Sequence, residues 1–348
     1  MSFSAGNKLK ITLFGTSHGP CIGATLAGIK AGISFDFDEV RKETDRRKSR
    51  LALSTPRREE DNFQIISGIC DGTTDGGPIT VIFPNNDTDS RDYDRYIPRP
   101  GHADYPAFVK YAGMNDHRGG GFFSGRMTAP LVFAGALCKQ ILKQKGIKIF
   151  SHIKSVKDLE EASFAETEIT DEMIDKLTAS SFPCIEKEKE FLEIIEKAEN
   201  DSVGGVCEIM ATGIAVGVGE PFFDSVESTL AKLVFSVHGI KGIEFGYGFG
   251  ITRLYGSQAN DEIVSDGEIT LKTNHSGGIN GGLTNGMPLL FRVAVRPTPT
   301  VSLPQNTVNL KTGENETIVG RGRHDKAIIL RIAPIMEAVT AMGLCDLI

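Results

Sequence analysis

The N-terminal part of the chain alternates between apolar and polar positions in a way that predicts a strand hairpin and then a helix. Residues 8–15 and 22–29 have the two-residue period of strands, with a short polar turn between them. Asp36 or Asp38 can cap a helix that runs through Val40 into a group of arginines. We therefore expect a β-hairpin that is followed directly by a helix.

The next stretch places a long polar loop after a strand and before an apolar helix. Residues 78–83 read as the strand and residues 128–145 as the helix, which Gly146 ends. Residues 85–104 form the polar loop, and loops of that length inside a compact domain are usually functional or disordered. Because this loop ends in Arg-Pro-Gly-His-Ala-Asp, we expect it to be functional.

The C-terminal half repeats part of this pattern. Residues 242–249 and 288–295 read as strands, and residues 326–342 read as a closing helix. A glycine-flanked apolar run that leads to Phe and Asp occurs at 28–40 and again at 213–226, each time after a strand-like run and before a helix. We predict an α+β fold in a single large domain, residues 1–348, with two related strand–turn–helix units.

Composition favours a packed protein without a membrane span. The 348 residues are 40% hydrophobic, which suffices for a sizeable core, and no apolar run has the length that crosses a bilayer. The N-terminus lacks the basic and apolar regions of a signal peptide. The six cysteines are dispersed without a C-x-x-C pair, so we expect reduced thiols and a cytoplasmic protein.

The net charge of −7 conceals two segments of opposite sign. Residues 155–200 are strongly acidic and predict a solvated, helical surface segment. Residues 41–58 carry eight basic side chains, mostly arginine, and arginine suits carboxylates and phosphates. This basic stretch is either an anion-binding segment or a solvated helix face.

Three histidines lie in short turns beside glycines and charged residues. His18 occurs in Gly-Thr-Ser-His-Gly, His102 in Arg-Pro-Gly-His-Ala-Asp, and His324 in Gly-Arg-Gly-Arg-His-Asp. Glycine lets the backbone approach a ligand closely, while Arg, His and Asp bind anions and transfer protons. We expect these turns to form one site that binds an anion and moves a proton.

A further glycine-rich turn, residues 118–126, leads into the apolar helix predicted at 128–145. Such a turn at a helix N-terminus is suited to anions. It is alternatively a plain connection or an RNA-binding Arg-Gly-Gly segment, and the apolar helix directly after it argues against the RNA-binding segment.

Other chemistries find little support in the sequence. There is no P-loop, and no G-x-G-x-x-G lies between a strand and a helix. No two histidines have the spacing of a metal site, and no G-x-S-x-G elbow accompanies Ser17 and His18. The basic stretch has no aromatic residue for stacking on nucleic acid. The residues alone indicate an anion-handling enzyme that needs no metal and binds neither nucleic acid nor a membrane.

A series of motifs runs in order through nearly the whole chain except residues 155–200. They lie at 15–19, 45–48, 55–61, 67–68, 76–79, 86–87, 90–93, 99–104, 118–121, 217–224, 256–258, 274–282, 296–298 and 322–325. Taken together, these motifs resemble the chorismate synthase family. So many collinear matches leave little room for chance.

The resemblance implies a reaction, a cofactor and an assembly. The family converts 5-enolpyruvylshikimate 3-phosphate to chorismate by a 1,4-elimination of phosphate, and it needs reduced FMN although the reaction has no net redox change. The protein itself orients the substrate and the flavin, stabilises the charges that develop and controls the transfer of protons. The resemblance also implies antiparallel sheets that sandwich helices, and a homotetramer. The reduced flavin comes either from the protein's own NADPH-dependent reductase activity or from an external supply.

The resemblance also assigns roles to single residues of this sequence. His18 and His102 match the two catalytic histidines, which serve the departing phosphate and the protonation state of the flavin, and Asp325 matches an aspartate that relays a proton through flavin N5. Arg46 and Lys48 either assist or are solvated charges. The residues matched to the substrate are Arg47, Arg57, Arg99, Arg126 and Arg323. Those matched to the flavin are Arg47, Phe122, Phe123, Ser124, His238, Gly239, Gly281, Arg296, Pro297, Thr298, Pro299, Thr300 and Arg323.

The sequence departs from the family pattern near these residues. Thr16 stands where the family usually has an acid. Phe122, Phe123, Gly125 and Met127 stand in a segment usually written Arg-Ser-Ser-Ala-Arg-Glu-Thr. The replaced arginine and serine are expected flavin contacts, so we predict weaker FMN binding than in a typical member.

Two alternative functions are compatible with these departures and with the basic stretch. The first is a catalytically altered flavin or phosphometabolite binder of the same family, although such a binder has no need of His18, His102 and Asp325 together. The second is an RNA-binding protein, which would require a strongly salt-dependent affinity for RNA.

Overall fold

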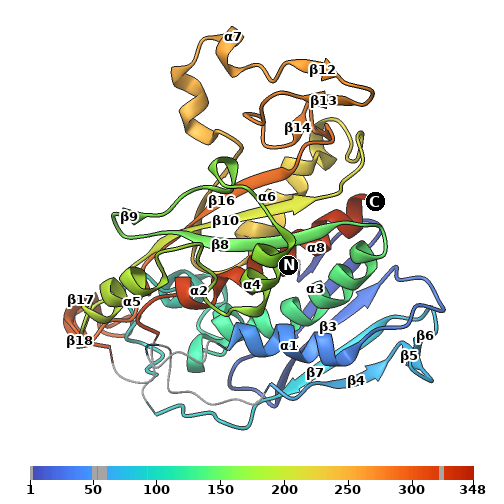
Figure 1. Ribbon diagram of the computed structural model, residues 1–348. Coiled ribbons are helices and arrows are strands. Elements are labelled where there is room, and N and C mark those ends of the chain that lie inside the picture. Colours follow the sequence, from blue (N-terminus) through green and yellow to red (C-terminus); the bar gives the residue numbers. More distant parts are fainter. Residues whose placement is uncertain (1–2, 49–52, 54–60, 92, 321–324) are drawn as a thin grey trace.

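Two five-stranded antiparallel sheets enclose a layer of helices (Figure 1). The computed structural model describes residues 3–348 apart from 49–52, 54–60, 92 and 321–324. The first sheet has the order β1 (Ser4–Ala5), β2 (Lys10–Gly15), β3 (Cys21–Ala27), β7 (Ile79–Pro84), β4 (Gln64–Ser67). The second has the order β11 (Ile240–Phe245), β16 (Leu289–Val295), β10 (Gly205–Thr212), β8 (Lys148–Val156), β9 (Leu159–Glu160).

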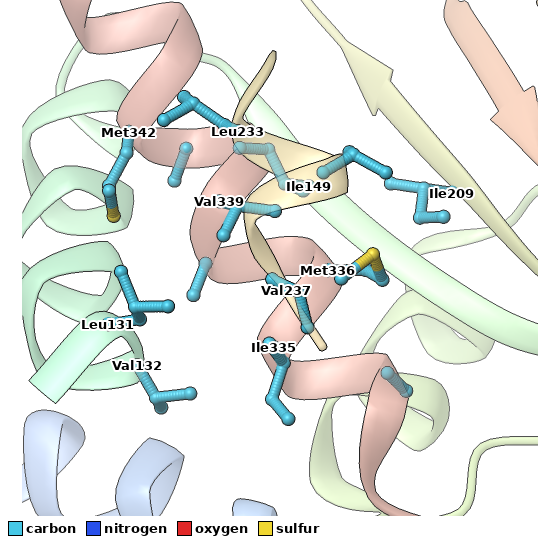
Figure 2. Packing of buried hydrophobic residues seen from close by; sticks show 14 of the residues in the cluster. Leu131, Val132, Ile149, Ile209, Leu233, Val237, Ile335, Met336, Val339 and Met342 are labelled. Atoms are coloured by element: carbon cyan, nitrogen blue, oxygen red, sulfur yellow. The ribbon is translucent and has the colours of Figure 1, made fainter. Parts of the chain in front are cut away.

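The helices between the sheets are α1 (Phe37–Arg47), α3 (Thr128–Lys143), α6 (Val226–Ser236) and α8 (Ile329–Leu347). Helix α3 packs on β3 and β7 of the first sheet, and α8 packs on β8 and β10 of the second. Helix α8 is buried around most of its circumference, which explains why its sequence is apolar on every face. Figure 2 shows Met336 and Val339 of α8 among Leu131 of α3 and Ile209 of β10. These layers confirm the predicted α+β sandwich.

The remaining elements are short and connect these layers. They are β5 (Ile69–Cys70), β6 (Thr73–Thr74), α2 (Asp104–Lys110), η1 (Arg118–Phe123), η2 (Gly125–Met127), η3 (Phe164–Glu166), α4 (Asp171–Ala179), α5 (Glu188–Glu196), η4 (Phe222–Asp224), η5 (Gly248–Arg253), α7 (Gly256–Ala259), β12 (Ile263–Ser265), β13 (Ile269–Leu271), β14 (Ile279–Asn280), β15 (Leu283–Thr284), β17 (Pro304–Val308) and β18 (Asn315–Val319). The part of the chain with α7, β12 and β13 projects beyond the sandwich (Figure 1).

The two halves of the chain have the same topology, as the repeated sequence pattern predicts. In each half, two antiparallel strands lead to a helix, and a later strand pairs beside the second of them. The strand order β2-β3-β7-β4 of the first half corresponds to β8-β10-β16-β11 of the second. Each half ends in one of the two central helices, α3 or α8.

A repeated pair of hydrogen bonds supports this correspondence. The hydroxyl of Thr74, in β6, donates to the carbonyl of Lys30, and the hydroxyl of Thr284, in β15, donates to the carbonyl of Ala215, both at 2.6 Å. Each hydroxyl also accepts a hydrogen bond from a backbone N–H, that of Ile33 or Val218, which lies three positions after the residue whose carbonyl it binds; both distances are 2.9 Å. The segments predicted to be related therefore occupy equivalent places in the two halves.

The structure confirms most of the predicted elements and corrects one. Strands β2 and β3 form the expected hairpin, and the side chain of Asp36 caps α1 by accepting the N–H groups of Asp38 and Glu39. The strand predicted at 242–249 is wrong in its second half, because β11 ends at Phe245. Gly246 follows with a φ of 56°, which a strand does not accommodate.

A buried carboxylate lies in the middle of α8. Glu337 accepts hydrogen bonds from Arg46 of α1 at 2.9 Å, from Lys139 of α3 at 2.5 Å and from the hydroxyl of Ser151 of β8 at 2.7 Å. Burial raises the pKa of this carboxyl, but the charges of Arg46 and Lys139 outweigh it and lower the pKa to about 2. Arg46 is therefore neither a solvated charge nor available to bind an anionic ligand at the surface.

The acidic segment 155–200 packs against β8 of the second sheet through α4 and α5. Its helices α4 and α5 expose most of their acidic side chains, whereas Phe164 and Leu177 pack against Phe150 and Met210 in a second apolar cluster. The segment is thus acidic on its outer side and apolar where it meets the sheet.

A buried histidine fastens this segment to the sheet. His152 of β8 lies fully buried between two carboxylates, with Nδ1 2.6 Å from Glu161 and Nε2 3.1 Å from Glu208. Burial lowers the pKa of His152, but the hydrogen bonds to both carboxylates outweigh it and raise the pKa above its ordinary value. Glu161 also accepts the backbone N–H groups of residues 185–187.

Candidate active site

The segments that carry most of the predicted site residues come together at equivalent positions of the two halves. Residues 85–104 follow β7, and residues 296–303 follow β16, its counterpart in the second sheet. Arg296 Nη1 donates to the carbonyl of Gly101 at 2.8 Å, and His102 Nε2 is hydrogen-bonded to Thr300 Oγ1. These hydrogen bonds therefore join the two loops, one from each half of the chain.

The His18 turn rests on the glycine run before α3. The hydroxyl of Ser17 donates to the carbonyl of Gly119 at 3.0 Å, and the N–H of Ser17 donates to Gly121 at 3.2 Å. Gly119 has a φ of 59°, and a Cβ at this position would lie 2.3 Å from Cδ2 and Nε2 of His18. Only glycine leaves room for the imidazole here.

The His102 turn is held by an ion pair within its own loop. Arg99 donates to both carboxylate oxygens of Asp104, at 2.7 and 2.9 Å, and the N–H of His102 donates to the carbonyl of Arg99 at 3.2 Å. Burial raises the pKa of Asp104, but the hydrogen bonds from Arg99 outweigh it and hold the pKa below its usual value. The turn is therefore fixed at both ends.

Two of the arginines predicted to bind substrate share one buried carboxylate. Asp61 has a fully buried side chain and pairs with Arg47, from the end of α1, and with Arg126, from the turn before α3. Burial raises the pKa of Asp61, but the two guanidinium groups outweigh it and lower the pKa to about 2. Arg126 also donates to the side chain of Asn85 at 2.6 Å. The motif at 55–61 contains Asp61, but no local feature of the sequence distinguishes it from the neighbouring acidic residues.

Asp325 pairs with an arginine that the sequence analysis did not identify. Arg331 Nη2 donates to Asp325 Oδ1 at 2.7 Å. Arg331 lies in the first turn of α8, where burial lowers its pKa and the charge of Asp325 offsets only part of this effect. The sequence feature that could have identified Arg331 is its position as a single arginine within the apolar helix predicted at 326–342.

Most residues assigned to a flavin also lie together. The ring of Phe122 is 5.5 Å from that of Tyr111, and the ring of Phe123 is 5.9 Å from that of His238. His238 Nε2 lies 3.3 Å from the carbonyl of Phe122, and Ser124 accepts the N–H of Arg126 at 3.4 Å. The N–H of Arg296 donates to Gly239 at 2.9 Å. Residues 122–124, 238–239 and 296–300, which include Pro297, Thr298 and Pro299, therefore form one neighbourhood.

Gly281 lies apart from this neighbourhood. It belongs to the turn between β14 and β15, and the next residue, Gly282, accepts the N–H of Val226 at the start of α6. His238 follows the other end of α6, and a helix of 11 residues is roughly 16 Å long. Within one chain, the structure does not bring Gly281 to the other residues assigned to the flavin.

Three predicted residues lie outside the described part of the chain. They are Arg57, Arg323 and His324. Among the residues that the structure describes, no group of three His, Cys, Asp or Glu side chains is placed to hold a metal ion. No helix in the described ranges combines the length and apolarity needed to cross a membrane.

Comparisons with known proteins point to one family over the full length. The profile of the family described as "Chorismate synthase" matches residues 9–348. The chorismate synthase of Dehalococcoides mccartyi is 42% identical over 355 residues, which cover 100% of this chain and 96% of that protein. That of Chitinophaga pinensis is 44% identical over 345 residues, which cover 99% and 95%.

A third relative and a solved structure agree with this result. The chorismate synthase of Pyrococcus abyssi is 42% identical over 349 residues, which cover 98% of this chain and 96% of that protein. A crystal structure of chorismate synthase superposes with a TM-score of 0.75 at 28% identity, and the match covers 99% of this chain and 92% of that one.

Proposed function

This chain belongs to the chorismate synthase family, and from that premise we propose that it converts 5-enolpyruvylshikimate 3-phosphate to chorismate and phosphate with the help of reduced FMN. The observation that carries the proposal is that the two histidine turns meet. The ring of Tyr93 packs against His18 and also lies under the guanidinium of Arg99 in the His102 turn, and His102 is hydrogen-bonded to Thr300 of the second half. The comparisons give no support to the alternative of a non-enzymatic flavin or phosphometabolite binder.

The charges at the site suit an anionic substrate. Arg47 and Arg126 bring two positive charges to the single negative charge of Asp61, so this buried group retains a net positive charge. Asp61 also fixes the two guanidinium groups in place before a ligand arrives. We propose that they bind the phosphate and carboxylates of the substrate together with Arg99 and, from outside the described residues, Arg57 and Arg323.

The residues near the glycine run fit a flavin. Gly119, Gly120 and Gly121 all have positive φ, so the backbone of this run can approach a ligand without interference from side chains. Phe122 and Phe123 offer aromatic surface for a ring system in place of hydrogen-bonding side chains. When bound there, reduced FMN supplies electron density to the reacting ring.

The protein's own part is to orient the ligands and to handle protons. We propose that His18 serves the departing phosphate, that His102 would set the protonation state of a flavin bound beside it, and that Asp325 would act as the proton acceptor on the protein. His102 is fixed for this role by its hydrogen bond to Thr300.

Other properties follow from family membership. We propose that residues 1–348 form one chorismate synthase-like domain, with 155–200 as a segment on its surface. We also propose that the protein works as a homotetramer in the cytoplasm. Its reduced flavin comes either from its own NADPH-dependent reductase activity or from a separate reductase.

An anaerobic assay tests the proposed function. Protein, reduced FMN and 5-enolpyruvylshikimate 3-phosphate are mixed, and chorismate and phosphate are followed together. His18→Ala should lower turnover by roughly 10²-fold or more, as loss of a general acid does, while circular dichroism stays unchanged. His275→Ala is the matched control, because His275 bonds to Ala259 in the projecting part of the chain. Absence of chorismate with the unmodified protein, or full activity of His18→Ala, would refute the proposal.

A further inference from the structure

The His18 turn is held at its base by a single residue from another strand. Asn85 follows directly after β7, beside the start of β3. Its side-chain amide donates to the carbonyls of Thr16 and Gly19, at 2.9 and 2.8 Å, and the carbonyl of Pro20 accepts its backbone N–H at 3.1 Å. The backbone on both sides of His18 is therefore bonded to the same residue.

The oxygen of the Asn85 amide faces an arginine. Arg126 Nε donates to Asn85 Oδ1 at 2.6 Å. The other two nitrogens of this guanidinium donate to Asp61 at 2.6 Å and to the carbonyl of Pro84 at 3.1 Å. Arg126 is thus fixed by three acceptors, and one of them is the residue that holds the His18 turn.

The chemistry of its partners fixes the orientation of the Asn85 amide. A backbone carbonyl can only accept a hydrogen bond, and a guanidinium can only donate one. The NH₂ group must therefore face the carbonyls of Thr16 and Gly19, and the oxygen must face Arg126. Both N–H groups and the oxygen are used, and an aspartate in this place would lack both donors.

We propose that Asn85 is a positioning residue that sets the place of His18 relative to Arg126, so that both side chains meet one bound substrate in the required geometry. The inference rests on the proposed function only for the identity of that substrate. Such positioning matters because a misplacement of about 1 Å can lower turnover roughly 10²-fold. The sequence motifs at 86–87 and 90–93 do not include Asn85, and the family resemblance assigned it no role.

Replacing Asn85 should affect the turn more than the arginine. The turn would lose two side-chain hydrogen bonds, although Ser17 would still tie it to the glycine run before α3. Arg126 would lose one partner and keep Asp61 and the carbonyl of Pro84. Binding of an anionic substrate should therefore change less than turnover.

Two variants test the inference in the anaerobic assay. Asn85→Ala removes all three side-chain hydrogen bonds, and its kcat should fall roughly 10- to 100-fold while KM changes less than about threefold. Asn85→Asp has the same shape and keeps an acceptor for Arg126 but lacks both donors, so it serves where the alanine variant does not fold. Its kcat should fall by a similar factor.

A double-mutant cycle shows whether Asn85 acts through His18. In the His18→Ala background, either replacement of Asn85 should lower kcat further by less than about threefold. An equal loss of kcat with and without His18 would overturn the inference, because Asn85 would then only support the fold. An unchanged kcat in the Asn85 variants of the otherwise unmodified protein would overturn it as well.

Gln140→Ala is the matched control. The amide of Gln140 also joins two segments, because it donates to the carbonyl of Asp36 and accepts the N–H of the same residue, both at 2.8 Å. It lies near the end of α3, whereas Arg126 precedes the start of that helix. This variant should have the kcat of the wild type.

Nuclear magnetic resonance of ring-labelled histidine separates the inference from the proposed reaction. In the ligand-free full chain, the His18 signals are assigned by their loss in His18→Ala. They should move toward those of a solvated histidine in Asn85→Ala and stay in place in Gln140→Ala. Unchanged His18 signals in Asn85→Ala would overturn the inference even where chorismate is formed. This measurement needs neither substrate nor FMN, so an inactive wild type would count against the proposed function alone.

Discussion

Replacing Glu337 with glutamine should destabilise the protein more than replacing an exposed carboxylate, because it removes a fully buried negative charge that pairs with both Arg46 and Lys139. The side chain of Glu337 is 0% exposed, and Arg46 and Lys139 are 7% and 18% exposed. Glutamine has nearly the same shape, so packing in the helical layer stays intact. Glu337→Gln therefore changes the charge of the side chain and leaves its shape nearly unchanged.

The pKa of Glu337 sets the size of the effect. It lies at about 2 in the folded protein against 4.5 for an ordinary glutamate. At about 1.4 kcal/mol per pKa unit, the ionised carboxylate contributes roughly 3 kcal/mol at neutral pH. This figure lies within the roughly 3–5 kcal/mol that breaking a buried ion pair typically costs.

The sign of the pH dependence follows from the lowered pKa. The contribution is complete above the pKa of the unfolded state and is lost as pH falls toward the folded value, so at about pH 3.5 it should have dropped to about 2 kcal/mol. The free energy of unfolding is measured by urea titration of wild type and Glu337→Gln between about pH 7 and the acid limit of folding.

Glu43→Gln is the matched control for this experiment. Glu43 also pairs with Arg46 and Lys139, but its side chain is 17% exposed, so its removal should cost less. A Glu337→Gln protein as stable as wild type at neutral pH would refute the reasoning. So would a difference between the two proteins that does not shrink in acid.

Two further predictions concern a second buried charge and the cofactor. His152→Gln should be less stable than wild type mainly below the raised pKa of His152, because a raised pKa contributes stability that is lost as pH rises through it. The free energies of unfolding of the two proteins, measured with urea from about pH 6 to pH 9, should converge as the pH rises. A difference between them that does not depend on pH would contradict a protonated His152 between Glu161 and Glu208. FMN should bind roughly tenfold more weakly than to a family member with arginine at the position of Phe122, since a charge-assisted hydrogen bond is missing. Fluorescence titration measures the affinity for FMN, and Phe122→Arg should raise it. FMN binding by the wild type as tight as in a typical family member would show that aromatic contact compensates for the missing hydrogen bond.

The sequence predicted those parts of the fold that depend on neighbouring residues. The hairpin of β2 and β3 follows from alternation, and the start of α1 follows from the capping side chain of Asp36. The repeated glycine pattern also indicated the two related halves. Its structural meaning became visible only through Thr74 and Thr284, which lie far along the chain from the segments that they hold.

The candidate site was predicted where a motif contains a reactive side chain and was missed where a residue supports another. His18 and His102 were predicted as site residues from their own turns, and their roles stay predictions. Asp61, Arg331 and Asn85 act through ion pairs and hydrogen bonds to distant segments, and such partners cannot be read from local sequence. For the same reason, a cluster of basic residues did not reveal that Arg46 points into the core while Arg47 points to Asp61.

The central place of helix α8 has a consequence for how the protein is made. Every strand of both sheets precedes α8 in the chain, yet β8 and β10 bury their inner faces against it. While the chain is being synthesised, the parts of β8 and β10 that pack on α8 therefore stay exposed until residues 329–347 have been made. Apolar strand surface that is exposed in this way is prone to aggregation, so the interval between the synthesis of β10 and that of α8 is a period in which the growing chain is at risk of aggregating.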